Sequence, residues 1–209
     1  MCNGDVSKAR PLLASDLPEL CALDEILLRK SLQSQLHDGR TRVSVVPDIE
    51  TIRWHHARED FVSEELYGKV PQIKGAIVGE VPGQRAWCYW TRMRYNEDPK
   101  HSKGNTLHIL RLVIEDQGGN ASKYVPAIQA LLASAQHQAK EWYMEEVEMW
   151  TPSAEAVAAA QQIEPKAQVV YRDRESIASL MWYGESPLPN GGGVAEKIEW
   201  VGNEKYGWC

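Results

Sequence analysis

Residues 106–115 read Thr-Leu-His-Ile-Leu-Arg-Leu-Val-Ile-Glu, and this run decides the fold. It is mostly apolar and lacks the alternation of a half-exposed strand, which predicts a central strand covered on both faces. Residues 116–122 form a glycine-containing connector, 123–142 carry apolar side chains at helical spacing, and 147–150 form a further short strand. A strand, a helix and a second strand in this order are typical of α/β sheets.

The sequence before this unit predicts two helices and further strands. A short strand at 8–14 precedes a helix that starts at Ser15 or Asp16 and runs to about Gln35. Asp48 resembles an N-cap for a second helix, which Gly68 ends. The apolar stripe of that helix, 49–66, comprises Ile52, Trp54, Ala57, Phe61 and Leu66. Extended segments are expected at 42–46, 74–79 and 85–95.

The sequence after this unit predicts a last helix and two strands. Thr151 followed by Pro152 suits the N-cap and first turn of a helix at 153–163. Strands are expected at 168–171 and 176–183. A flexible loop at 184–193 and an apolar tail at 194–209 complete the chain. The expectation is one α/β domain over 1–209, with a core at 9–183 and a twisted mixed sheet flanked by helices.

Composition and charge argue against several classes of partner. The 209 residues carry a net charge of −6, which disfavours binding to nucleic acid or to an anionic membrane surface. No apolar run reaches the roughly 20 residues of a membrane span, and the first residues have no signal-peptide core. The 4 cysteines form no CxxC pair, so we expect reduced thiols in a cytoplasmic protein and no metal site.

Several stretches resemble a known family. The order of elements and the opening Arg10-Pro-Leu-Leu-Ala resemble GNAT-type acyl-CoA N-acyltransferases. The stretches that begin at Ile52, Lys74, Trp87 and Asn105 resemble the C-terminal half of fungal L-lysine N6-acetyltransferase-like proteins, as does the closing segment from Trp200. The resemblance covers about residues 9 to 209. It implies a GNAT-like fold, acetyl-CoA as co-substrate, and lysine or another small amine or amino acid as acceptor.

The resemblance also implies a place for the co-substrate. GNAT enzymes hold acetyl-CoA where the strand that corresponds to 106–115 splays from the strand that corresponds to 147–150. Backbone groups of the first strand bind the pantetheine, and N–H groups at the next helix start bind the pyrophosphate. The matching positions here are Leu112, Val113, Ile114, Gln117, Gly118, Gly119, Asn120 and Lys123. Asn120 replaces the glycine of the family pattern, so an ordinary strand-to-helix connector is the alternative.

Three side chains are candidates for the general base that takes a proton from the amine. His56 has Asp60 four residues later on the same helical face, and a nearby carboxylate tunes an imidazole. Glu115 lies at the carboxyl end of its predicted strand, where α/β sheets bind ligands. His108 lies on the same strand among apolar neighbours. The alternatives are a solvated helix face for His56 and structural ion pairing around Arg111 for Glu115.

A substrate pocket is a further expectation. Trp87 and Tyr89 on the strand 85–95 could line an acceptor cleft, with core packing as the alternative. Arg92 and Arg94 could bind a substrate carboxylate, and His55 could lie beside it.

Against a standard GNAT mechanism, helix 153–163 lacks the tyrosine that many GNAT enzymes use as general acid. Two hypotheses therefore stand: an acetyltransferase, or a non-catalytic GNAT-like domain that shapes a pocket or binds a catalytic GNAT partner.

Overall fold

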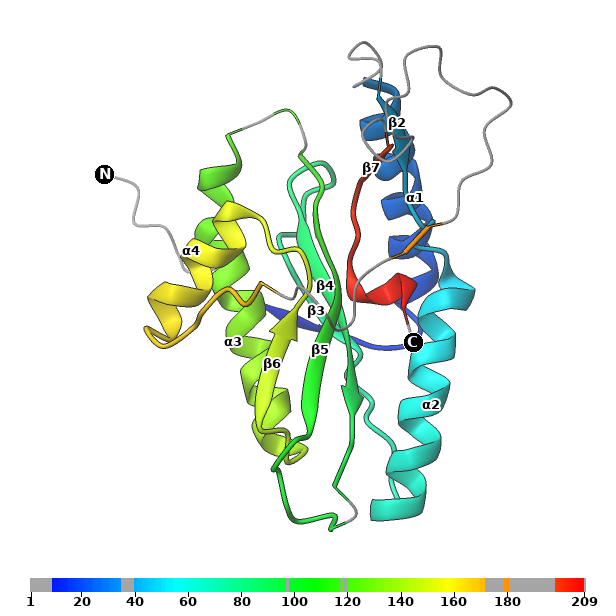
Figure 1. The fold of residues 1–209 in the computed structure, drawn as a ribbon, viewed down its shortest axis with the longest axis vertical. Coiled ribbons are helices and arrows are strands. Elements are labelled where there is room, and N and C mark those ends of the chain that lie inside the picture. Colours follow the sequence, from blue (N-terminus) through cyan, green and yellow to red (C-terminus); the bar gives the residue numbers. More distant parts are fainter. Residues whose placement is uncertain are drawn as a thin grey trace.

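A five-stranded mixed sheet forms the centre of the molecule, with helices on both faces (Figure 1). The computed structural model describes residues 9–34, 40–96, 98–116, 118, 120–171, 179–180 and 198–208. The strands lie in the order β1-β3-β4-β5-β6; only the β5–β6 pair is parallel. Their bounds are β1 Arg10–Leu12, β3 Gly75–Val78, β4 Ala86–Met93, β5 Thr106–Ile114 and β6 Glu146–Met149. The predicted α/β class with a mixed sheet is confirmed.

Each face of the sheet has its own apolar core. Helices α3 (Val125–Glu141) and α4 (Ala154–Ile163) cover one face, and the short 3-10 helix η1 (Ala121–Tyr124) leads into α3. Helices α1 (Leu17–Ser34) and α2 (Ile49–Tyr67) cover the other face.

A second, two-stranded parallel sheet joins distant parts of the chain. It pairs β2 (Thr41–Val43) with β7 (Ile198–Trp200), and a 3-10 turn, η3 (Lys205–Gly207), follows β7. Tyr206 of this turn is buried in the core between α1, α2 and the sheet. The end of the chain is therefore part of the fold.

The predicted helix ends are confirmed for α2 and corrected for α4. The Asp48 carboxylate accepts the Thr51 N–H at 2.7 Å, and Gly68 ends α2 with a left-handed φ of 63°. The prediction that Thr151 caps α4 is wrong. Ser153 is the cap, because its hydroxyl accepts the Ala156 N–H at 3.2 Å.

The predicted end of the sheet also differs. Residues 168–171 form no strand, so β6 is the last strand of the sheet among the described residues. Of the predicted strand 176–183 only residues 179–180 are described, and they are not in a strand. The predicted loop 184–193 lies outside the described residues.

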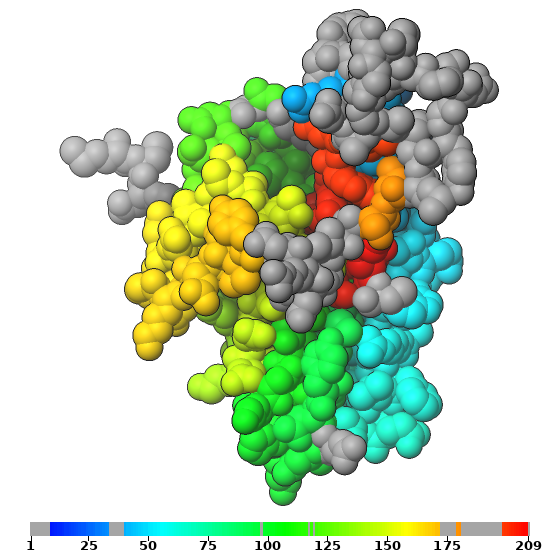
Figure 2. All heavy atoms as spheres, in the orientation of Figure 1, coloured from blue at the N-terminus to red at the C-terminus, as the bar shows by residue number. Residues whose placement is uncertain are grey.

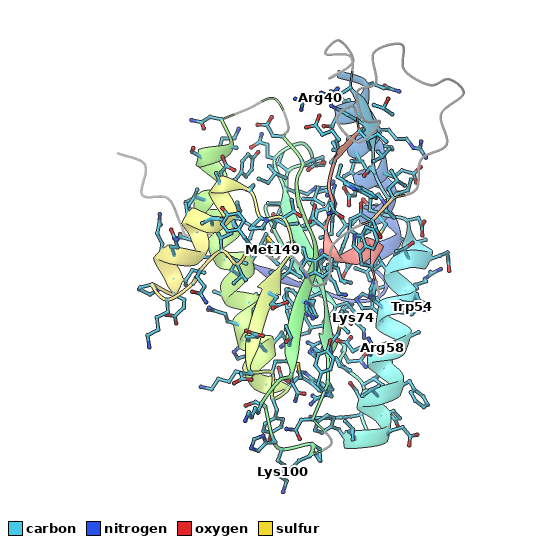
Figure 3. All side chains as sticks on the ribbon, viewed as in Figure 1. Arg40, Trp54, Arg58, Lys74, Lys100 and Met149 are labelled. Carbon is cyan, nitrogen blue, oxygen red and sulfur yellow. The ribbon has the colours of Figure 1, made fainter. Side chains whose placement is uncertain are left out.

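Helix α2 is oriented against its amphipathic pattern. Its buried side chains include the polar residues His55, His56 and Glu59, whereas Trp54 is 48% exposed and Phe61 is 69% exposed. Figure 3 marks Trp54 on this helix. The hydrophobic spacing predicted the helix correctly but not which face packs on the sheet. Among the described helices, none combines the length and the hydropathy that a bilayer span needs.

Candidate functional site: the gap between β5 and β6

The family resemblance implies that β5 splays from β6; in the structure β6 is paired along its whole length, and β5 continues beyond the end of β6. They pair only from Thr106↔Glu146 to Ile109↔Met149. Directly after this pairing β5 carries one extra residue, since Trp90 of β4 faces Ile109 and Tyr89 faces Arg111. This β-bulge bends the strand and increases its twist. The second half of β5 therefore runs beyond its pairing with β6.

A carboxylate accepts a backbone N–H from the part of β5 that extends beyond β6. The Glu115 N–H donates to Arg85 O, directly before β4, at 3.0 Å. Because N–H directions alternate along a strand, the Leu112 N–H points to the opposite edge, on the β6 side. It donates to Glu204 Oε2 at 3.0 Å. The backbone donor expected to bind pantetheine is thus already paired with the protein's own side chain.

Arg111 fixes this carboxylate in place. Its guanidinium makes a bidentate contact to Asp24 of α1, at 2.9 and 2.8 Å, and its Nη1 contacts Glu204 Oε1. Burial raises the pKa of Glu204, although Arg111 and the Leu112 N–H oppose that shift. Burial alone would lower the pKa of Arg111, but Glu204 and Asp24 outweigh it and raise that pKa. The sequence analysis offered an ion pair with Arg111 as the alternative role of Glu115; the structure pairs Arg111 with Asp24 and Glu204, and Glu115 with Arg85.

The segment that carries Glu204 is tied to both sides of the gap. The Thr151 hydroxyl, just after β6, donates to Asn203 O at 2.7 Å. The Lys205 ammonium lies 4.9 Å from the ring centroid of Trp150. The Tyr206 hydroxyl donates to Val45 O at 2.5 Å. Figure 2 shows the segment, in red, between the yellow surface of α4 and the cyan surface of α2.

The connector after β5 is closed by local contacts. Asn120 caps η1 by accepting the Ser122 N–H at 3.0 Å, and Lys123 donates to Asp116 at 2.5 Å. Gly118 donates its N–H to Asp116 at 3.3 Å. These groups satisfy one another, which is the ordinary-connector alternative. Gln117 and Gly119 lie outside the described residues. Val113 and Ile114 pack into the two cores of the sheet.

A second gap lies between β3 and β4. Their pairing stops at Gly75↔Tyr89, followed by one bond from the Trp90 N–H to Lys74 O at 3.0 Å. From there on, α2 supplies the hydrogen-bond partners of β4. His56 Nε2 lies 3.0 Å from Trp90 O, and Glu59 accepts the Arg92 N–H at 2.9 Å.

A buried charge network holds this second gap closed. Glu59 accepts from Lys74 Nζ at 2.8 Å and from Arg92 Nη1 at 2.7 Å, and Arg92 Nη2 donates to Gln138 of α3 at 2.7 Å. Burial raises the pKa of Glu59, but Arg92 and Lys74 together outweigh it, so that the pKa lies below the usual range. The side chains of Glu59 and Arg92 are both 0% exposed. Arg92 therefore binds the protein interior in this structure, not an open cleft.

The remaining predicted substrate residues also contact protein groups. Arg94 donates to Trp142 O at 2.5 Å and stacks over Tyr67 at 4.3 Å. Trp87 and Tyr89 are both 0% exposed, and the Trp87 indole donates to the Tyr89 hydroxyl at 2.8 Å. The structure places both rings in the core, which is the packing alternative.

The two histidines of α2 bond to carbonyl groups. Because Trp90 O can only accept, the 3.0 Å contact assigns the proton to His56 Nε2. Burial lowers the pKa of His56 to about 4. His55 Nε2 lies 2.9 Å from Tyr206 O, and burial lowers its pKa too. A buried, neutral imidazole whose pKa is lowered in this way is poorly suited to take a proton from a substrate amine.

The other two candidate bases are far from each other. Glu115 is clamped by Arg85 at 2.9 and 3.0 Å, and these hydrogen bonds lower its pKa. His108 Nδ1 lies 3.4 Å from Glu148 on β6. Seven residues along a strand separate the two by about 23 Å. The structure thus does not bring His108 and Glu115 to one reacting atom. Within the described ranges, no three His, Cys, Asp or Glu side chains are placed to hold a metal ion.

The described part of the structure also contains a groove of about 940 Å³, which borders this gap, since Ile109, Thr151 and Asn203 are among its lining residues. It follows β6 between α3, α4 and residues 164–170, and none of the predicted site residues lines it.

Sequence reasoning missed Asp24, Glu204 and the bulge at Leu110. A weak signal for Glu204 was present in the sequence. A buried Arg111 requires an anion, and Glu204 is an acidic residue that directly follows Gly202-Asn203.

Comparison with known proteins adds the family. A family model described as "LYC1 GNAT-like C-terminal domain" matches residues 3–209. One solved structure is similar, an aminoglycoside acetyltransferase from an uncultured soil metagenomic sample in complex with sisomicin. It is 14% identical, with a TM-score of 0.39, over 85% of this chain and 98% of that chain. Among curated proteins, none matches this chain in sequence. The chain belongs to the LYC1 GNAT-like C-terminal domain family.

Proposed function

We propose that this domain is a non-catalytic GNAT-like domain that binds a catalytic acetyltransferase domain and leaves acetyl-CoA to that partner. One observation carries the proposal: Glu204 accepts the Leu112 N–H in the gap between β5 and β6. A carboxylate in that position repels an anionic cofactor and takes the donor that a pantetheine amide would use. The cofactor would have to displace a charge-assisted hydrogen bond that Arg111 reinforces.

The state of the candidate catalytic groups supports the same proposal. His56 is buried and bonded to Trp90 O, and Glu115 is clamped by Arg85. Arg92, the predicted carboxylate clamp, is bound to Glu59 and Gln138. The name of the family, which describes a GNAT-like domain at a C-terminus, fits a domain that works beside another one.

A titration tests the cofactor half of the proposal. We expect isothermal titration calorimetry with acetyl-CoA to give no saturable heat for the wild-type chain up to millimolar concentration. Glu204→Ala is the informative variant, because it removes the carboxylate and leaves Arg111 paired with Asp24. Saturable one-to-one binding to the wild type would contradict the proposal.

A mixing experiment tests the partner half. The probe is a purified acetyltransferase domain from the N-terminal half of a LYC1-type protein. We expect it to form a one-to-one complex with this chain in sedimentation velocity, and to acetylate lysine faster in the complex than alone. An unrelated GNAT enzyme is the control. No complex at tens of micromolar of each protein would contradict this half.

Acetyl transfer by this chain itself is the second candidate. The register of β5 and β6 favours it, because beyond Ile109 no residue of β6 pairs with the backbone of β5, and an extended ligand could pair there if Glu204 moved. The acceptor would then be the amine of lysine or a similar small molecule. If Glu204→Ala binds acetyl-CoA and acetylates lysine while the wild type does neither, the segment 198–208 is an inhibitory plug over a working site.

A further inference from the structure

The outer face of α2 carries an apolar stripe that nothing in the described structure covers. Trp54 and Phe61 are 48% and 69% exposed, and Ala57 between them is also exposed. At 100° per residue these three side chains project within about 60° of one another. The inner face holds His55, His56 and Glu59 in contact with the sheet and η3. Two large apolar side chains aligned on one exposed helix face are typical of a contact surface.

Charged residues border the stripe in a regular order. Arg53 and Glu64 lie along one margin, and Arg58 and Glu65 along the other, by the same helical count. All four are exposed. On each margin the basic residue precedes the acidic residue along the helix. Arg53 also makes a 2.8 Å contact to Glu50 in its own helix.

This order is self-complementary under a two-fold axis. When two such helices pack antiparallel about an axis perpendicular to both, each margin faces the same margin of the other copy. Arg53 then faces Glu64 of the other copy, and Arg58 faces Glu65. The first pairing centres the axis between residues 58 and 59, and the second centres it between residues 61 and 62. An axis near residue 60 leaves each pair about 4.5 Å out of alignment along the helix, which long side chains can span, and brings the two Phe61 side chains together near Ala57. One register near residue 60 is therefore compatible with both charge pairs and with the apolar stripe.

We propose that a second copy of this chain covers the outer face of α2, in an antiparallel, two-fold symmetric helix pair centred near Phe61. The partner is a second copy because the pattern complements itself, with opposite charges on both margins. The 19-residue helix is about 28 Å long, so the contact is modest in area and the dimer is weak.

Sedimentation equilibrium over a concentration series tests the proposal. We expect the mass to rise from 23.6 kDa toward twice that value at high concentration. Phe61→Glu puts a charge at the centre of the contact and should weaken association at least about thirty-fold. Ile26→Glu is the matched control, because Ile26 is 62% exposed on α1, away from the stripe, and should leave association unchanged.

A charge exchange tests the register itself. Arg58→Glu and Glu65→Arg should each weaken self-association, because each places like charges face to face in both halves of the pair. An equimolar mixture of the two variants should restore association, since both contacts then join opposite charges. The proposal is overturned by a wild type that stays monomeric at millimolar concentration, by a dimer that survives Phe61→Glu, or by a mixture that does not recover. It is also overturned if Phe61→Glu abolishes binding of the acetyltransferase domain instead.

Discussion

The gap between β3 and β4 and the gap between β5 and β6 flank the two central strands of the sheet. In both gaps one strand continues past the end of its pairing with the neighbouring strand. A carboxylate then accepts a backbone N–H of the strand that continues. Glu59 accepts from Arg92 in the first gap, and Glu204 accepts from Leu112 in the second. An unpaired strand edge buried in a protein is costly, which explains why both are filled.

The two carboxylates differ in how they are held. Glu59 belongs to a 19-residue helix, has a fully buried side chain and contacts two cations. Glu204 belongs to the short C-terminal segment and has a side chain 13% exposed, and its one cation, Arg111, has Asp24 as a second partner. The first gap is therefore closed by a carboxylate on a long helix, whereas the second is closed by a carboxylate on the short segment after β7.

The largest expected effect is in the first gap. Glu59→Gln leaves Lys74 and Arg92 buried with too little negative charge, and we expect a loss of about 3–5 kcal/mol in the free energy of unfolding. Urea denaturation measures it, with Glu80→Gln at an exposed position as the control. A loss under about 1 kcal/mol would mean that this gap is as loosely closed as the other.

The next effect is a pH dependence of the same gap. Burial lowers the pKa of His56 in the folded protein to about 4, below the 6.5 of an ordinary histidine. Folding favours the neutral ring, so the stability that this group contributes is complete above pH 6.5 and falls as the pH drops toward 4. Between pH 7 and pH 5 we expect a loss of about 2 kcal/mol.

The variant His56→Gln sharpens this test, because its side-chain amide can still donate to Trp90 O. Unfolding free energies at pH 7 and pH 5 should differ less in the variant than in the wild type. His137→Gln, at an exposed position on α3, should keep the wild-type difference. If the unfolding free energy changed equally between pH 7 and pH 5 in the wild type and in His56→Gln, the pKa of the His56 ring would not be lowered in the folded state.

A smaller effect is expected in the second gap. Glu204→Ala should cost about 1–2 kcal/mol, because Leu112 loses its acceptor while Arg111 keeps Asp24. Glu204→Gln, which retains an oxygen acceptor, should cost less. A loss as large as that of Glu59→Gln would contradict the distinction between the two gaps.

The smallest effect concerns the tie across the second gap. Thr151→Val removes the hydroxyl that donates to Asn203 O, and we expect about 0.5–1 kcal/mol. Amide hydrogen exchange should rise in residues 198–208 and stay unchanged in α2. Thr151→Ser keeps the hydroxyl and is the control, so faster exchange in that variant would point to backbone strain.

The sequence predicted those parts of the fold that depend on local pattern. The apolar run of β5 and the cap residues Asp48 and Gly68 of α2 each determine their element through nearby residues. The expected splaying of β5 from β6 came from a family resemblance, and the bulge at Leu110 in β5 has no marker in the sequence.

The candidate site was less predictable because long-range contacts build it. Leu112 and Glu204 are 92 positions apart, and no spacing rule connects them. The buried face of α2 was predicted wrongly for a related reason. Hydrophobic periodicity assigns Trp54 and Phe61 to a packed face, but it does not say whether the sheet or another molecule provides the packing.

The most direct test of the closed gap follows the Leu112 amide itself. In a ¹⁵N-labelled sample titrated with acetyl-CoA, we expect the Leu112 resonance to keep its position and its slow exchange up to millimolar cofactor. A saturable shift of that resonance, together with those of residues 202–206, would show that the cofactor displaces Glu204 and would contradict a non-catalytic domain.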